Sequence, residues 1–111
     1  MAFDYRLKKE KDFSRVFKEG KRIFSDSLTL IYLPSKELKM GVAVSKKHGG
    51  SVKRNRIKRL LRENYRVFED KISSGLSIVF LLKKKANIDE VNFNLVKSDM
   101  EYILKKANVL I

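Results

Sequence analysis

The segment Leu76–Leu82 limits the folds open to this chain more than any other part of the sequence. Its residues, LSIVFLL, are nearly all apolar, and the segment stands between the Ser73-Ser74-Gly75 break and a run of lysines, Lys83–Lys85. A short apolar run with such flanks is typical of a β-strand buried on both faces, and we predict that it is central in a sheet. The three lysines that end it are predicted to form a solvated turn.

Two other segments have the pattern of strands. Arg22–Leu33 is rich in β-branched and aromatic residues, and we expect Ser25-Asp26-Ser27 to interrupt it with a bulge or a bend, so that it can form one strand or two. Leu38–Ser45 follows as a further strand. Its alternation puts small residues, including Ala43, on one side, which leaves space for a cleft beside the sheet.

Helical spacing of apolar residues predicts one helix before these strands in the sequence and another after them. The first covers about Lys9–Glu19, with Phe13 and Phe17 on one face, and the last covers Val91–Ala107, with Phe93 on its apolar face. A pair of phenylalanines among lysines suits either a hydrophobic core or the binding of single-stranded nucleic acid.

The middle helix is strongly basic, and Ser51 can cap its N-terminus. Ile57 and Leu61 lie on its apolar face, with Tyr65 at the edge. The opposite face carries a stripe formed by Asn55, Lys58, Arg59, Arg62 and Arg66. From Ser45 to Arg66 there are nine cations and a single acid, whereas helix faces that are merely solvated usually mix the two signs. The stripe therefore favours binding to the phosphates of a nucleic acid.

The order helix, strands, helix, strand, helix predicts an α/β (α+β) sandwich, in which three helices pack on a mixed sheet of about four strands. A length of 111 residues with 43% hydrophobic content suits one RNA-binding domain over residues 1–111. Within it, we expect residues 1–8 to be a basic, partly mobile lead-in.

Composition narrows the function further. A net charge of +13, from 26 Lys and Arg against 13 Asp and Glu, implies a polyanionic partner, although charge alone does not distinguish RNA from DNA. The sequence has no cysteine, only one histidine and no cluster of acids, so we predict no metal or cofactor bound by the protein alone and no catalysis by this chain. No apolar run approaches about 18 residues, so we expect no membrane span and a cytoplasmic location.

The segment Val44–Glu63, VSKKHGGSVKRNRIKRLLRE, resembles the signature of the bacterial ribonuclease P protein subunit, which is centred on Arg54-Asn55-Arg56. Upstream, Arg6–Arg22 resembles the opening helix of that family with its paired phenylalanines. The likeness covers most of the chain. It implies a left-handed crossover in the strand, helix, strand unit over Leu38–Leu82, where the general rule would give a right-handed one.

The resemblance also implies a function. The family subunit belongs to a ribonucleoprotein endoribonuclease that removes the 5′ leader from precursor tRNA, with catalysis by the partner RNA and with Mg²⁺ or other divalent ions in the assembled particle. By this likeness, the residues that would bind the catalytic RNA are Arg54, Asn55, Arg56, Lys58, Arg59, Arg62 and Arg66. The cleft for the leader would be formed by Phe13, Phe17, Ile31, Ala43, Lys46 and Lys47.

Two other functions remain open from the residues alone. A ribosomal protein, or another binder of structured RNA without a role in catalysis, would use the same basic helix. A helix that reads DNA comes third, and the resemblance argues against a DNA partner.

Overall fold

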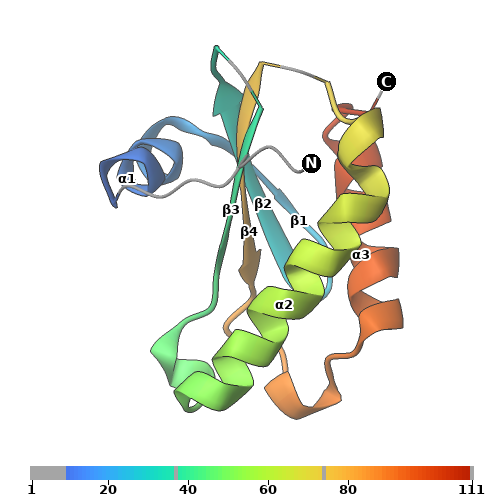
Figure 1. Ribbon diagram of the computed structural model, residues 1–111. Helices are drawn as coiled ribbons and strands as arrows, with labels where there is room; N and C mark the ends of the chain where they lie inside the picture. The colour runs from blue at the N-terminus through green and yellow to red at the C-terminus, as the bar shows by residue number, and fades with distance from the viewer. Residues whose placement is uncertain (1–9, 37, 74, 111) are drawn as a thin grey trace, which may run out of the picture.

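A computed structural model describes residues 10–36, 38–73 and 75–110 of the chain, and the predicted lead-in over residues 1–8 lies outside this part. The helices are α1 (Glu10–Glu19), α2 (Ser51–Phe68) and α3 (Phe93–Lys106), and the strands are β1 (Lys21–Phe24), β2 (Leu28–Pro34), β3 (Lys39–Ala43) and β4 (Leu76–Leu82). Short 3-10 turns are η1 (Lys46–His48), η2 (Glu69–Lys71) and η3 (Ile88–Glu90). The predicted order of elements is confirmed (Figure 1).

The four strands form one mixed sheet in the order β1-β2-β4-β3. As predicted, β4 is central, because it pairs antiparallel with β2 and parallel with β3. The bend at Ser25-Asp26-Ser27 divides the first predicted strand segment into the antiparallel pair β1 and β2. The parallel strands β3 and β4 are joined through α2, which is the strand, helix, strand unit predicted over Leu38–Leu82.

Helices cover both faces of the sheet (Figure 1): α2 and α3 lie on one face and α1 lies on the other. Alternation along β2 serves both layers, since Leu30 belongs to the larger core beneath α2 and α3, whereas Ile31 belongs to a smaller core beneath α1. Neither side chain has exposed surface. Val16 anchors α1 on the smaller core, together with the half-buried rings of Phe13 and Phe17.

Three predictions about element ends and faces are wrong. Ser51 is the first residue of α2 and not its cap, because Gly50 occupies the cap position and offers no side chain. Phe93 is 37% exposed because it is the first residue of α3. The helix is capped by Asn92, whose side chain accepts a hydrogen bond from the Leu95 amide (2.9 Å). Tyr65 is buried and not at the edge of the apolar face, as its ring packs edge-on against that of Phe80.

Gly20, which ends α1, has no room for a side chain. A Cβ at this position would lie 2.6 Å from the Val16 carbonyl oxygen and 2.6 Å from Ile31 Cγ2. Backbone and core atoms cannot move aside cheaply, so Gly20→Ala should lower the free energy of unfolding by about 1 to 3 kcal/mol in chemical denaturation. Gly50→Ser is the control, because a Cβ at Gly50 meets no atom within 4 Å and serine suits a helix cap. Equal losses in both variants would contradict the prediction.

Candidate nucleic-acid interface

Helix α2 is held against the sheet by one face, which turns the opposite face outward. Ile57 and Leu61 have no exposed surface and belong to the larger core. Asn64, which the sequence did not single out, is also fully buried, and its side-chain amide donates to the carbonyl oxygens of Leu60 (3.0 Å) and Phe93 (3.3 Å). These contacts fix both the position and the rotation of the helix.

The outward face of α2 carries the predicted stripe. A surface hollow of about 370 Å³ is lined by Asn55, Arg59, Arg62, Glu63 and Arg66. Lys58, Arg59 and Arg66 make no hydrogen bond or ion pair with another described residue. Arginine and lysine side chains grouped on a rigid helix suit the phosphates of a folded RNA.

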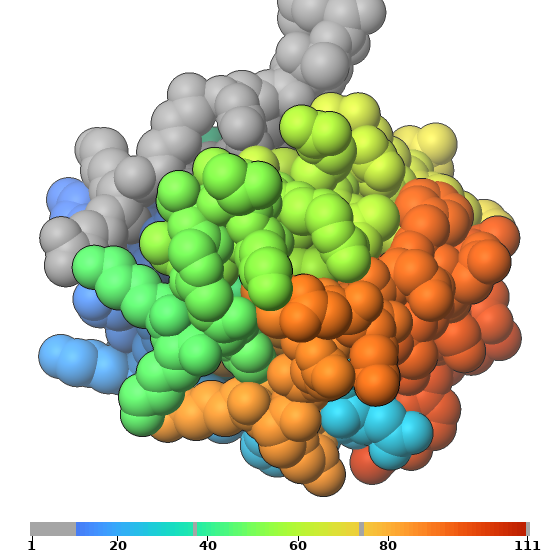
Figure 2. Space-filling view, turned by 90° about the horizontal axis from the view of Figure 1, so that it is seen from below, coloured from blue at the N-terminus to red at the C-terminus, as the bar shows by residue number. Residues whose placement is uncertain are grey.

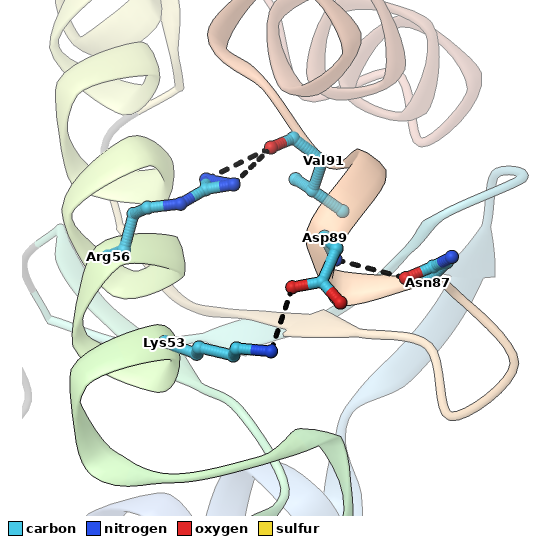
Figure 3. A network of polar contacts seen from close by, with 5 residues as sticks. All are labelled: Lys53, Arg56, Asn87, Asp89 and Val91. Atoms are coloured by element: carbon cyan, nitrogen blue, oxygen red, sulfur yellow. Dashed lines mark hydrogen bonds and ion pairs between the residues drawn. The ribbon is translucent and has the colours of Figure 1, made fainter.

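Arg56 behaves differently from the stripe, although it belongs to the same motif. Its two terminal nitrogens donate to the carbonyl oxygen of Val91, at 3.0 and 2.8 Å (Figure 3). Nearby, Lys53 Nζ lies 3.0 Å from Asp89 Oδ1, and the Asp89 amide donates to the Asn87 side chain. These contacts tie α2 to the segment between β4 and α3, so the structure gives Arg56 a supporting role and does not bring it to the hollow.

Arg56→Ala should therefore destabilise the protein. The change removes both hydrogen bonds to the Val91 carbonyl oxygen, and because Arg56 is itself exposed we expect the free energy of unfolding to fall by about 1 to 1.5 kcal/mol in chemical denaturation. Arg59→Ala removes the same charge from an exposed site without a described partner, and its stability should stay within about 0.5 kcal/mol of the parent protein. If the two variants were equally stable, the bond to Val91 would not hold in solution.

The loop between β3 and α2 is closed by its own contacts. Arg54 Nε donates to the Gly49 carbonyl oxygen at 3.1 Å, and the Gly49 amide donates to the Lys46 carbonyl oxygen at 3.3 Å. Gly49 has a φ of 141°, a region that side chains other than glycine rarely adopt. Lys46 and Lys47 are exposed on this loop, so their charges lie at the end of β3.

The predicted cleft residues lie on the α1 face of the sheet. Ala43 pairs with Leu81 across β3 and β4, and Leu81 packs with Phe13 and Phe17 around the smaller core. The two rings, Leu81 and Ala43 are all half-buried, so each keeps some exposed surface on this face, and Ala43 is the last residue of β3, before the η1 lysines. Leu81 was not among the cleft residues predicted from the sequence. Its pairing with the small residue Ala43 across β3 and β4 places it there.

Ile31 is the exception among the predicted cleft residues. It has no exposed surface, because α1 covers it. It therefore supports the floor of the cleft from beneath and cannot itself contact a ligand.

In the part of the chain that the structure describes, no three His, Cys, Asp or Glu residues are grouped so that they could hold a metal ion. None of the described helices is long and apolar enough to cross a membrane.

Comparison with known proteins gives a consistent family. The family model described as Ribonuclease P matches residues 1–108. The ribonuclease P protein component of Caldanaerobacter subterraneus subsp. tengcongensis is 38% identical over 104 residues, covering 92% of this chain and 88% of the relative. That of Clostridium kluyveri is 38% identical over 109 residues, covering 95% and 96%.

Solved structures agree with these relatives. The Staphylococcus aureus RNase P protein superposes with a TM-score of 0.84 and 32% identity, covering 96% of this chain and 98% of the other. The RNase P protein from Thermotoga maritima gives a TM-score of 0.81 and 30% identity, covering 91% and 96%.

Proposed function

The chain belongs to the ribonuclease P protein family, and on this premise we propose that two separate surfaces of the protein bind two RNAs. It is the protein component of ribonuclease P, a ribonucleoprotein endoribonuclease that processes tRNA, and it is not catalytic alone. The outward face of α2 binds the catalytic RNA. The partly exposed floor on the α1 face binds the 5′ leader of precursor tRNA.

The assignment of α2 to the catalytic RNA rests on charge held in a rigid frame. The stripe lies on a helix whose opposite side is fully buried, so its cations keep their spacing when the RNA binds. Pre-organised cations lose little conformational entropy on binding and can meet several phosphates at once. The stripe and its hollow, in which Glu63 is the only acid among the described residues of the lining, are the observation that carries the proposal.

The assignment of the α1 face to the leader rests on a different chemistry. A single strand exposes unpaired bases, which stack on aromatic rings while cations nearby meet its phosphates. Phe13 and Phe17 are half-buried, so each ring is fixed by the core yet still presents an edge or face to solvent. Ala43 has a small side chain, which leaves space above the sheet for the leader, and the exposed Lys47 supplies a positive charge just beyond the end of β3.

The cutting step belongs to the partner RNA in this proposal. The described residues offer no cluster of carboxylates for two metal ions, so Mg²⁺ or other divalent ions would be held by RNA in the assembled particle. The protein would lower the repulsion between the catalytic RNA and the substrate, and would hold the leader. A cytoplasmic location is part of the same proposal, as the sequence has no cysteine.

Reconstitution tests this function. Mixed with a ribonuclease P RNA at low magnesium concentration, the protein should restore removal of the 5′ leader from a precursor tRNA. The RNA alone and the protein alone serve as controls, and neither should cleave under these conditions. Tight RNA binding without any gain in leader cleavage would instead indicate another kind of structured-RNA binder.

A further inference from the structure

An exposed aromatic ring stands at the end of β1, on the same sheet face as the cleft. Phe24 pairs with Thr29 across β1 and β2, and Thr29 pairs with Leu81 across β2 and β4. Residues directly opposite each other in antiparallel strands lie on the same face, so Phe24 shares the α1 face with Leu81 and the predicted cleft. Phe24 is nevertheless 50% exposed, and it does not belong to the smaller core on that face.

Lys83 lies over this ring, and it is not part of a merely solvated turn as predicted. Its ammonium nitrogen is 5.4 Å from the centre of the Phe24 ring and donates to the Ser25 carbonyl oxygen at 2.8 Å. Because β2 lies between β1 and β4, the Lys83 side chain must cross the end of β2 to reach both partners. Figure 2 shows the segment after β4 (orange) at the same end of the molecule as the η1 loop (green) and the β1–β2 turn (cyan).

A second cation completes the group. Arg22 lies two residues before Phe24 on β1 and therefore on the same face, and its guanidinium donates to the Phe17 carbonyl oxygen at 3.1 Å. Arg22 thus stands between the C-terminal turn of α1 and the exposed ring. Both cations are held by backbone carbonyl oxygens, and both keep further N–H donors for a ligand.

We propose that Arg22, Phe24 and Lys83 form a second subsite for single-stranded RNA, which extends the cleft across the sheet from β3 to β1. Phe24 stacks on a base, and the two cations meet the phosphates on either side of it. Phe24 is three strand positions away from Ala43, or about 14 Å at the usual spacing of strands, so the subsite takes leader nucleotides beyond those in the first cleft. The inference rests on the proposed function of that cleft.

The protein contains a matched control for this site. Tyr102 on α3 is 53% exposed, and Lys106 Nζ lies 5.6 Å from its ring centre, so its local chemistry is nearly that of Phe24 and Lys83. Helix α3, however, packs on the opposite face of the sheet (Figure 1). A leader on the α1 face cannot reach it, so an effect specific to Phe24 cannot come from an exposed ring in general.

The test uses the reconstituted particle and a series of precursor tRNAs with leaders of increasing length. With Phe24→Leu, affinity should stop rising with leader length earlier than in the parent particle, and the longest leaders should bind about five- to a hundredfold more weakly. Phe24→Tyr keeps a ring and should retain the parent affinity. Tyr102→Leu should match the parent at every length. Melting temperatures of the free variants check that each one folds.

The possible failures can be separated. If the parent particle bound precursor and mature tRNA equally well, the proposed function of the cleft would be wrong. If the parent particle preferred the precursor and Phe24→Leu followed it at all leader lengths, only the second subsite would be wrong. A loss that is as large for mature tRNA as for the longest leader would also overturn it, because that pattern indicates a general change in the particle.

Discussion

Replacing Lys58, Arg59 and Arg62 together by alanine should weaken binding of the catalytic RNA by roughly a hundredfold or more at about 0.1 M salt. Each phosphate contact contributes about 0.7 to 0.9 to the slope of log affinity against log salt concentration, so three lost contacts should reduce that slope by about 2 to 3. The helix should remain folded, because its buried face is untouched. Titration of the RNA at several salt concentrations measures both quantities.

The control for this prediction removes the same charge elsewhere. Lys36, Lys71 and Lys97 are exposed and lie outside both proposed RNA surfaces, so their replacement by alanine gives the same net charge as the stripe variant. The comparison of the two variants shows whether RNA binding depends on where the cations lie or only on the net charge. If the control variant lost as much slope as the stripe variant, the protein would attract RNA through net charge alone, and the stripe would have no special role.

The layers of the fold were predictable because burial leaves a simple record in the sequence. The apolar run of β4 requires cover on both faces, and the alternation in β2 divides its residues between two cores. On α2, the 3.6-residue period separates Ile57 and Leu61 from the stripe, and the structure places each on the predicted side. Such patterns depend only on neighbours along the chain, which the sequence displays directly.

Polar side chains that bind distant backbone were not predictable in the same way. Arg56 donates to Val91, 35 residues away, and Lys83 donates to Ser25, 58 residues away. Both looked like ordinary cations of a basic protein, since nothing in their local sequence shows which carbonyl oxygen comes near in the fold. Helix ends failed for a related reason, because the last helix was predicted from Val91, whereas the Asn92 side chain caps it and α3 begins at Phe93.

The exposure of each cleft residue was also not predictable from the sequence. Ile31 lies on the same face of the sheet as the other predicted cleft residues, but whether a residue on that face is open or covered depends on where α1 lies. The helix covers Ile31 completely and leaves Leu81 and Phe24 partly exposed. The sequence therefore identified the correct face, and the packing of α1 decided which of its residues a ligand can touch.

Replacing both Phe13 and Phe17 by leucine should separate the two roles of these rings. Leucine keeps the helix and most of the apolar contact with the smaller core, but it cannot offer a flat ring to a base. The reconstituted particle should lose about 1 to 3 kcal/mol of binding free energy for each base that stacks, measured with a precursor tRNA that carries a leader of several nucleotides. Its affinity for mature tRNA and its assembly with the catalytic RNA should not change.

Val16, on the same helix, provides the structural comparison for that double variant. Its side chain is only 2% exposed and belongs to the smaller core, so Val16→Ala should lower the melting temperature without any preference between precursor and mature tRNA. The phenylalanine variant should give the reverse pattern, with a specific loss for the precursor and a small change in stability. A double variant that lost stability as Val16→Ala does, and lost affinity equally for both tRNAs, would mean that the rings of α1 serve the core and bind no leader.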